Sequence, residues 1–390
     1  MKNKILILTL LSLLLFSCKT FMERTADKTR ESTIIRVMLT LGDDVSILLN
    51  NDIIVEDENG KKLKFKFNVK SLVIKFDGNK ILFNNELLDD SLLIYSKDEG
   101  LISINNKDYF GSLKIIPHER GFMVVNYLPL ETYLMSVAPS EVPVKFDEEA
   151  IKAQVVAART YAYYSMKRNN KRDFDVDDTV RYQVYNGYNI DLNNQHIKKI
   201  YKAIDDTRSQ IVTYNGEPIL AYFHSNSGGK TRSGGDYFGP HSDLPYLVGH
   251  DDPYSIDLPG SNWEYRIGFD DFNKALSIQT DLTDDALIYN KDNFSYDNDG
   301  FIEKIKVLER EYYPKEIRRS VGYVNLRSER FYVELNYTDR LFDFKGIGFG
   351  HGVGMSQWGA EGMAQKGFNY KEIILFYYPN TIISGIVHED

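Results

Sequence analysis

The chain has 390 residues, of which 43% are hydrophobic and 26% charged, a composition typical of a globular protein with about one to three domains. Its formal net charge of −9 at pH 7 argues against nucleic acid as the main partner. Cys18 is the only cysteine in the sequence, so an intrachain disulfide and a cysteine-rich zinc site are both excluded.

The N-terminal segment is typical of an export signal. Two lysines precede an apolar run at residues 5–16, which is too short to span a bilayer. The run ends in Leu15-Phe16-Ser17-Cys18 and resembles a bacterial lipoprotein signal, in which the cysteine is lipidated and becomes the first mature residue. A conventional signal peptide with an incidental cysteine is the alternative. We predict a lipoprotein signal peptide over 1–17, a tether over 18–32, and export with lipid anchoring to a membrane through Cys18.

Residues 33–127 are predicted to form an antiparallel β region. Apolar runs of strand length recur between turn signals such as Asn59-Gly60 and Asp77-Gly78. Over 62–70 apolar residues alternate with lysine and asparagine, which gives one buried and one solvated face. The lysine-rich face either touches an anionic polymer or is simply solvated. The other predicted strands cover 34–39, 45–49, 91–95, 101–104, 112–116 and 122–127.

Two helices are predicted within residues 128–168. Pro129 suits the first position of a helix, and Pro139 and Pro143 should prevent that helix from continuing. Asp147 is placed to cap a second helix with its carboxylate. The residues predicted on the buried faces of the two helices are Leu130, Leu134, Val137, Ile151, Val155, Ala158 and Ala162.

A single carboxyl group lies in the short link between these helices, Ser140-Glu141-Val142-Pro143. The prolines hold Glu141 in a firm position beside apolar neighbours. Partial desolvation raises the pKa of a carboxyl group, which is what a general acid needs near neutral pH. The alternative is that Glu141 caps a helix end or is solvated.

Beyond residue 168 the pattern becomes mixed. It predicts a helix over 194–207 and then a strand, a turn and a strand over 210–224. His224 and Ser225 therefore fall where a strand enters a glycine-rich turn. Residues 251–345 carry short helix and strand signals around an acidic stretch at 281–299, and we predict an insertion there. A glycine-dense loop at 346–354 then leads into a helix at 358–366.

Several common catalytic and nucleotide-binding motifs are absent from the sequence. Gly229-Lys230-Thr231 lacks the glycine five residues earlier that a phosphate-binding loop requires, because that position is His224. The loop from Gly348 fails the dinucleotide-binding pattern, since Val353 occupies the third glycine position. Neither a nucleophile elbow nor an H-x-x-x-H pair occurs, which argues against a serine hydrolase and a metalloprotease.

Four separated blocks resemble, in order, those of the stage II sporulation protein D family and its relative, the amidase enhancer. The first contains LPLETYL, SEVP and EAIKAQVVAARTYA, and the second is Gln183-Val184-Tyr185-Asn186-Gly187. The third is Phe223-His224-Ser225-Asn226-Ser227-Gly228-Gly229-Lys230-Thr231. The last is GFGHGVGMSQWGA at 348–360, followed by Phe376-Tyr377-Tyr378-Pro379.

The resemblance implies a site and a reaction. Active members of the family are lytic transglycosylases that cut peptidoglycan glycan strands, and their catalytic glutamate matches Glu141. Some relatives carry a metal near the third block, but no cysteine neighbours His224 here, so we predict neither a metal nor a cofactor. The candidate substrate-binding residues in the blocks are Gln183, Tyr185, His224, Ser225, Ser227, His351 and Gln357.

Two cations of the second helix are further candidates. Lys152 and Arg159 lie about two helical turns apart and so share one face. The resemblance implies a preference for glycan strands without stem peptides, which expose lactyl carboxylates. We hypothesise that Arg159, helped by Lys152, holds such a carboxylate through paired hydrogen bonds. An exposed cationic edge is the alternative.

The sequence therefore predicts an α+β protein, with a β-rich region over 33–127 packed on a mixed catalytic domain over 128–390 that holds a cleft. The expected activity is cleavage of the bond between N-acetylmuramic acid and N-acetylglucosamine to give 1,6-anhydro ends, with Glu141 as general acid and base. A non-catalytic amidase enhancer that binds glycan is the alternative. The expected partners are glycan strands, a cell-wall amidase and a membrane facing the cell wall, but no nucleic acid.

Overall fold

The computed structural model describes residues 33–48, 53–63, 71–77, 80–83, 86–88, 91–97, 100–143, 145–179, 182–188, 194–279, 288–297 and 301–387. The predicted signal, Cys18 and the tether lie outside the described residues. So do most of the predicted lysine-rich face at 62–70, the glycine of the turn at 77–78, and parts of the acidic stretch at 281–299. No helix within the described ranges is both long enough and apolar enough to cross a membrane.

The fold is α+β, as predicted, and the chain divides into two compact units. One comprises residues 1–141, 162–197 and 385–390, and the other comprises 142–161 and 198–384. The two units share the helix α3 (Glu148–Asn169), because the division between them falls at residue 161.

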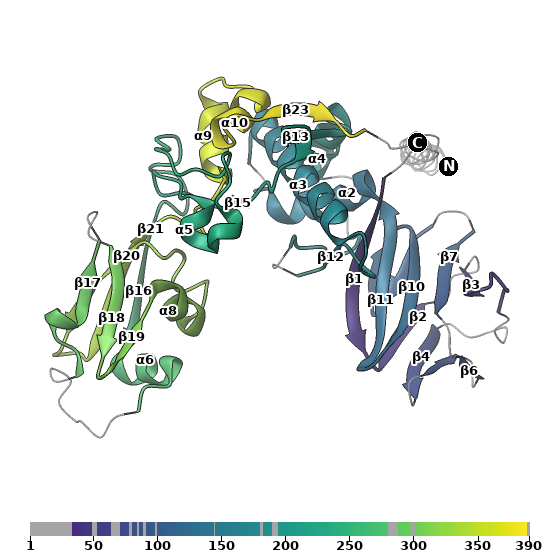
Figure 1. Ribbon diagram of the computed structural model, residues 1–390, viewed down its shortest axis with the longest axis horizontal. Coiled ribbons are helices and arrows are strands. Elements are labelled where there is room, and N and C mark those ends of the chain that lie inside the picture. The colour runs from purple at the N-terminus through teal and green to yellow at the C-terminus, as the bar shows by residue number, and fades with distance from the viewer. Residues whose placement is uncertain are drawn as a thin grey trace, which may run out of the picture. The chain divides into compact units, whose positions relative to one another are not determined.

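The first unit contains a six-stranded sheet in the order β12-β1-β11-β10-β7-β3, counted over the described residues. Its strands pair antiparallel except β12, which runs parallel to β1. Figure 1 shows β1, β11 and β10 side by side. Ile35 and Val37 alternate inward on β1, whereas β11 is buried along both faces. The strands are β1 (Ile34–Gly42), β3 (Ile53–Asp57), β7 (Leu92–Ser96), β10 (Ser112–His118), β11 (Gly121–Pro129) and β12 (Val176–Asp177).

A second six-stranded sheet of the same unit has the order β6-β5-β4-β2-β8-β9 within the part of the chain that is described. All of its pairings are antiparallel, which confirms the predicted antiparallel β region. Its strands are β2 (Asp44–Leu48), β4 (Ser71–Asp77), β5 (Lys80–Phe83), β6 (Glu86–Leu88), β8 (Ile102–Ile104) and β9 (Lys107–Tyr109).

Helix α2 (Leu130–Glu141) follows β11 directly and ends at the candidate acid. Leu130, Leu134 and Val137 are buried as predicted. The expectation that Pro139 prevents the helix from continuing is wrong, because Pro139 lies inside the last turn. A proline there removes only one hydrogen bond near the helix end, and the helix stops two residues later, ahead of Pro143.

Helix α3 begins one residue after its predicted cap. Asp147 Oδ1 accepts a hydrogen bond from the Glu149 N–H at 3.0 Å, which confirms the capping role. The predicted stripe of Ile151, Val155, Ala158 and Ala162 is fully buried.

The second unit combines helices with short strands. The predicted helix at 194–207 is α4 (Gln195–Asp206), and the predicted strand after it is β13. The predicted strand over 218–224 is present only as two two-residue pieces, β14 and β15. These elements are β13 (Gln210–Tyr214), β14 (Glu217–Pro218), β15 (Phe223–His224), α5 (Gly234–Phe238), a 3₁₀ turn (Pro240–Ser242), β22 (Met355–Ser356), α9 (Gln357–Gln365), α10 (Tyr370–Tyr377) and β23 (Ile382–Gly385).

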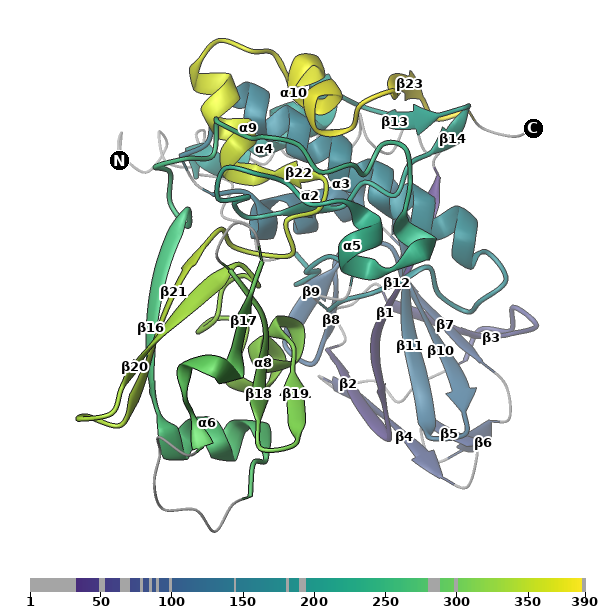
Figure 2. The same cartoon turned by 60° about the vertical axis from the view of Figure 1, so that its left-hand side comes forward.

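Residues 262–347 form a lobe of this unit with a hydrophobic core of its own, here called the inserted lobe. The chain enters on β16 and leaves on β21, which pair antiparallel from Asn262↔Ile347 onward. Figure 2 shows β16, β21 and β20 side by side. The lobe contains β16 (Asn262–Gly268), α6 (Phe269–Leu276), a 3₁₀ turn (Lys291–Asn293), β17 (Phe294–Tyr296), β18 (Ile302–Val307), β19 (Arg310–Tyr312), α8 (Pro314–Val321), β20 (Phe331–Asn336) and β21 (Leu341–Ile347).

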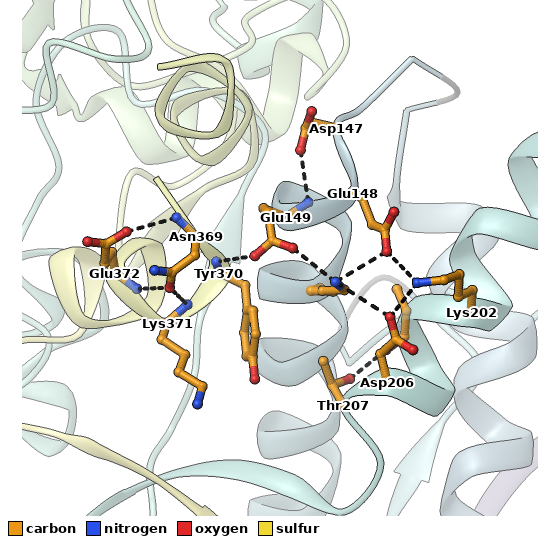
Figure 3. A network of polar contacts seen from close by, with 12 residues as sticks. Asp147, Glu148, Glu149, Lys202, Asp206, Thr207, Asn369, Tyr370, Lys371 and Glu372 are labelled. Carbon is orange, nitrogen blue, oxygen red and sulfur yellow. Dashed lines mark hydrogen bonds and ion pairs between the residues drawn. The ribbon is translucent and has the colours of Figure 1, made fainter. Parts of the chain in front are cut away.

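A polar network joins the start of α3 to α4 and α10 (Figure 3). Lys152 Nζ lies 2.9 Å from Glu149, 3.2 Å from Glu148 and 3.5 Å from Asp206. The other oxygen of Glu149 accepts a hydrogen bond from the Tyr370 N–H at 2.8 Å, at the start of α10. Although burial opposes its charge, the hydrogen bonds to Glu149 and Glu148 raise the pKa of Lys152.

This network predicts unequal effects for two neighbouring lysines. Lys152 and Lys202 pair with the same carboxylates, Glu148 and Asp206, but their side chains are 14% and 59% exposed. We expect Lys152→Ala to lower the free energy of unfolding by about 1–3 kcal/mol, because partly buried carboxylates lose their donor. Lys202→Ala should hardly change the melting temperature, because the pairs of Lys202 are solvated. Equal shifts in a thermal unfolding assay would contradict this account.

Candidate active site around Glu141

Glu141 is the last residue of α2, and its side chain is half-buried. Its Oε1 accepts a hydrogen bond from the Val184 N–H at 3.3 Å, so the second family block holds the carboxyl group. The firm position predicted from the sequence therefore has two sources, the end of a buried helix and a backbone donor from a distant segment.

The surroundings of Glu141 alter its acidity. Burial raises the pKa of the Glu141 carboxyl above its ordinary value of 4.5, and the Val184 N–H opposes this by favouring the charged form. A carboxyl group in such a place keeps its proton to a higher pH than a solvated one. That is the property a general acid requires.

The second family block is fastened to α2. The Tyr133 hydroxyl donates to Gln183 Oε1 at 3.2 Å, and the Ser136 hydroxyl donates to the Gly187 carbonyl at 2.5 Å. The rings of Tyr133 and Tyr185 stack with centroids 5.3 Å apart. These contacts hold the segment that supplies the Val184 N–H.

Tyr133 and Ser136 were not among the site residues predicted from the sequence. Both are buried on α2, and they lie three residues apart, so they share a face of the helix. Two polar side chains on the buried face of a predicted helix could have indicated this role. Buried polar groups are almost always hydrogen-bonded, so such residues predict partners in another segment.

Gly187 is needed for the approach of this block to β9. Its φ is +72°, and a Cβ there would lie 2.5 Å from the Asp108 carbonyl oxygen. Asp108 also accepts the Tyr188 N–H at 2.5 Å, which ties the end of the block to the sheet. A side chain at position 187 would push the block away.

Gln183 and Tyr185 are interior residues, at 1% and 2% exposure. The Tyr185 hydroxyl donates to Asn126 at 2.7 Å, and Asn126 in turn donates to the Phe110 carbonyl. The predicted direct contacts of Gln183 and Tyr185 with substrate are contradicted, because both side chains are enclosed by protein. Their polar atoms support the carboxyl group instead.

The third and fourth blocks meet in the second unit. Phe223 and His224 of β15 pair in parallel with Met355 and Ser356 of β22. The Asn226 N–H and the Phe349 carbonyl are joined at 3.0 Å, and a reciprocal bond runs back at 2.7 Å. The two blocks are therefore one piece of structure, although more than a hundred residues separate them.

Ser227 and Gln357 of these blocks are buried, which contradicts their predicted substrate contacts. The Ser227 hydroxyl donates to buried Asp252 at 2.6 Å, and Asp252 also accepts from Tyr377 at 3.0 Å. Ser225 is half-buried, and its carbonyl accepts from the Trp358 N–H at 3.0 Å. Of these three, only Ser225 keeps partial access to solvent.

The two histidines differ in exposure. His224 is 4% exposed, which contradicts a direct substrate contact, and its Nδ1 donates to the Val353 carbonyl at 3.1 Å. Burial lowers the pKa of His224 to about 4, so the ring is neutral near pH 7. His351 is half-buried, and burial, His224 and nearby arginines lower its pKa as well. Its Nδ1 accepts from the Val353 N–H at 3.0 Å.

Lys152 and Arg159 share a face of α3, as predicted, but that face packs on α4. Arg159 is fully buried and donates to Thr207, to the Gln210 carbonyl and to the Ile204 carbonyl at 3.2–3.3 Å. This contradicts the hypothesis that Arg159 holds a substrate carboxylate. Lys152 pairs with Glu148, Glu149 and Asp206, so it is a structural partner as well.

Within the described ranges, no group of three or more histidine, cysteine, aspartate or glutamate residues could hold a metal ion.

The predicted site residues fall into two groups. Glu141, Gln183 and Tyr185 lie together in one unit. The other unit contains His224, Ser225, Ser227, His351 and Gln357.

The chain is similar to known proteins over most of its length. A family model described as stage II sporulation protein matches residues 118–214, which include Glu141 and the second block. An uncharacterised protein of Brachyspira hyodysenteriae is 36% identical over 293 residues, which cover 73% of this chain and 74% of that protein.

The relatives with functional names include two from Bacillus subtilis. Stage II sporulation protein D of Bacillus subtilis is 32% identical over 271 residues, covering 67% of this chain and 76% of that protein. The amidase enhancer of Bacillus subtilis is 29% identical over 333 residues, covering 73% of this chain but only 45% of that protein.

The raised pKa of Glu141 predicts a pH-dependent effect of Glu141→Gln on stability. A carboxyl group whose folded-state pKa is raised contributes stability below its unfolded value near 4.5 and loses it as pH rises through the folded value. Glutamine does not ionise and still accepts from the Val184 N–H. We expect the variant to melt above wild type at about pH 7.5, with no difference near pH 4. A difference that is constant across this range would contradict the raised pKa.

The burial of Arg159 predicts that Arg159→Lys destabilises the protein. A single ammonium group cannot reach the three acceptors of the guanidinium, so buried oxygens lose their donors. We expect a loss of about 2 kcal/mol or more in the free energy of unfolding by denaturant titration. Arg208→Lys is the control, since Arg208 lies close by and pairs with exposed Asp205. Unchanged stability together with weakened glycan binding would restore the substrate role of Arg159.

Proposed function

Because the chain belongs to the stage II sporulation protein D family, we propose that it is a peptidoglycan lytic transglycosylase with Glu141 as its acid and base. The substrate is the β-1,4 bond between N-acetylmuramic acid and N-acetylglucosamine, in strands without stem peptides. The product carries a 1,6-anhydro end.

The reaction needs one carboxyl group that works twice. Protonated Glu141 gives its proton to the glycosidic oxygen, and the bond from that oxygen to C1 of the muramic acid breaks. Glu141, now a carboxylate, takes the proton of the C6 hydroxyl while O6 forms the new bond to C1. No water is consumed, and Glu141 regains its proton at the end. Glycosidases that use water pair two carboxylates for the same bond.

The placement of Glu141 is the observation that carries this proposal. Burial of the Glu141 carboxyl raises its pKa and so favours the protonated form, which is the direction that a general acid requires. The Val184 N–H stabilises the carboxylate that forms after the transfer, so both protonation states have support. A carboxylate that only capped a helix end would be stabilised in its charged form by remaining solvated, whereas Glu141 is half-buried.

The amidase enhancer of Bacillus subtilis supplies a second candidate function. In that alternative the chain binds glycan and stimulates a cell-wall amidase without cutting the strand. The two functions differ in one product, the anhydro end, which only a transglycosylase makes. For either function we keep the proposal that the chain is exported and held to a membrane facing the cell wall by a lipid on Cys18.

Glu141→Gln should abolish cleavage of peptide-free glycan strands and keep the fold. General acid–base catalysis contributes about 10²–10⁴-fold, so we expect at least about a hundredfold loss in the rate at which anhydro ends form. Mass spectrometry of the digested strands measures those ends. Glu119→Gln is the matched control, because Glu119 lies exposed in the turn between β10 and β11. Activity within about tenfold of wild type would remove Glu141 from the mechanism.

A further inference from the structure

Three cations of the second unit gather around one aromatic side chain. The Arg232 guanidinium lies 5.2 Å from the centre of the Tyr237 ring, and Lys315 Nζ lies 4.7 Å from it. Lys315 also donates to the Tyr237 carbonyl at 3.2 Å. Burial raises the pKa of Tyr237, and the positive charge of Arg318 opposes that rise. The same charge helps to lower the pKa of His351, so Arg318 lies close to both rings. We call Arg232, Lys315 and Arg318 the cationic cluster.

Arg318 is the unusual member of the cluster, because its side chain is buried without a counter-charge. The residue is 6% exposed, and it donates to the Leu326 and Arg327 carbonyls at 2.7 and 2.8 Å. Among the described residues no carboxylate forms an ion pair with Arg318 or Lys315, and Glu329 pairs with Arg232 at 3.0 Å. Buried charges in proteins are usually paired, so an anion is the missing partner.

The same region contains two buried acceptors that lack donors. Glu329 Oε2 accepts from Arg232, whereas Glu329 Oε1 is buried and accepts no hydrogen bond of normal geometry, although Tyr237 lies close enough for Glu329 to help raise its pKa. His224 donates from Nδ1, so its Nε2 is a bare acceptor, and it too is buried and unpartnered. The His224 ring lies 5.5 Å from that of His351, which in turn lies 5.7 Å from Tyr237. Because the His224 side chain is enclosed by protein, only Glu329, which lies beside the partly exposed Arg232, is placed to accept from a hydroxyl or amide donor of a ligand.

We infer that the cationic cluster, with Glu329, is a binding subsite for a sugar that carries a carboxylate. Among the polymers of the proposed function, this is the muramic acid of a peptide-free strand, whose lactyl group is ionised. The inference rests on that proposed function for its substrate, and it gives the selection of peptide-free strands to the cationic cluster rather than to Arg159.

The chemistry of the cluster favours such a sugar over a small ion. Three cations repel a metal ion, whereas a carboxylate forms paired hydrogen bonds with a guanidinium. Tyr323 is 52% exposed and lies 4.8 Å from the Arg318 guanidinium, so an apolar ring face stands beside the charge. Sugars combine an apolar face with hydroxyl and acetamide donors, which match the aromatic side chains and the Glu329 carboxylate.

Binding measured apart from cleavage tests the inference. The full chain carrying Glu141→Gln is titrated calorimetrically with peptide-free glycan strands and with N-acetylglucosamine oligomers of equal length, which lack the carboxylate. We expect the glycan strands to bind about tenfold more tightly than the neutral oligomers. Lys315→Ala should remove about tenfold of the affinity for the strands and leave that for the oligomers unchanged. Lys315 is exposed, so the variant should fold normally.

Arg266→Ala is the matched control, because it removes an exposed cation of the same lobe that pairs with Asp343. An equal loss with Arg266→Ala would mean that overall charge, and not the cluster, attracts the strand, and would overturn the inference. Equal binding of both oligosaccharides, or tighter binding of poly(glycerol phosphate) than of the glycan strands, would also overturn it.

The result is separable from the proposed function. Cleavage by the protein with Glu141 intact is followed on the same strands. Loss of affinity in Lys315→Ala without any cleavage by the parent chain would retain the subsite and reject the transglycosylase. Cleavage by the parent chain, together with an affinity for the strands that Lys315→Ala does not change, would retain the transglycosylase and reject the subsite.

Discussion

The hydrogen bond from the Val184 N–H to Glu141 is the contact on which the candidate site depends. The end of α2 delivers the carboxyl group, but a helix end alone leaves a glutamate side chain free to choose among rotamers. The backbone donor selects one position, and burial sets the acidity there. The hydrogen bonds that Tyr133 donates to Gln183 and that Ser136 donates to the Gly187 carbonyl hold the segment of this donor in place. Removing either of them would displace Val184 and, with it, the Glu141 carboxyl group.

Most residues of the family blocks therefore serve as supports. Ser227, Tyr185 and Arg159 direct their polar atoms to other protein groups in the interior. Each hydrogen bond contributes only about 1 kcal/mol net, but an unmade bond at a buried group costs more than that. Such residues cannot be exchanged one at a time without leaving a buried partner unsatisfied. A recognisable block of sequence can thus mark a fixed interior as readily as a surface that touches substrate.

The sequence predicted the elements that have a strong local pattern. The buried stripe of α3, its Asp147 cap and the alternating strand β1 follow from side-chain period and capping chemistry. The strand predicted over 218–224 is reduced to β14 and β15, and β22 was not predicted, since two-residue pieces have no period and exist only through their partners. The role of Arg159 was missed for a related reason. Helical spacing placed it beside Lys152, but only tertiary packing determines that α4 covers this face.

The net charge of this acidic protein does not describe the electrostatic field at the cationic cluster. The net charge of −9 would repel an acidic strand if it were spread evenly, and screening limits its reach to about 8–10 Å at ordinary salt. A carboxylate within that distance of Arg318 and Lys315 experiences those cations, and Arg232 already neutralises the Glu329 carboxylate in part. Desolvation strengthens this attraction, because Arg318 lies out of water. An acidic protein can therefore hold an acidic polymer at one place, provided that the cations there are buried enough to escape competition from salt.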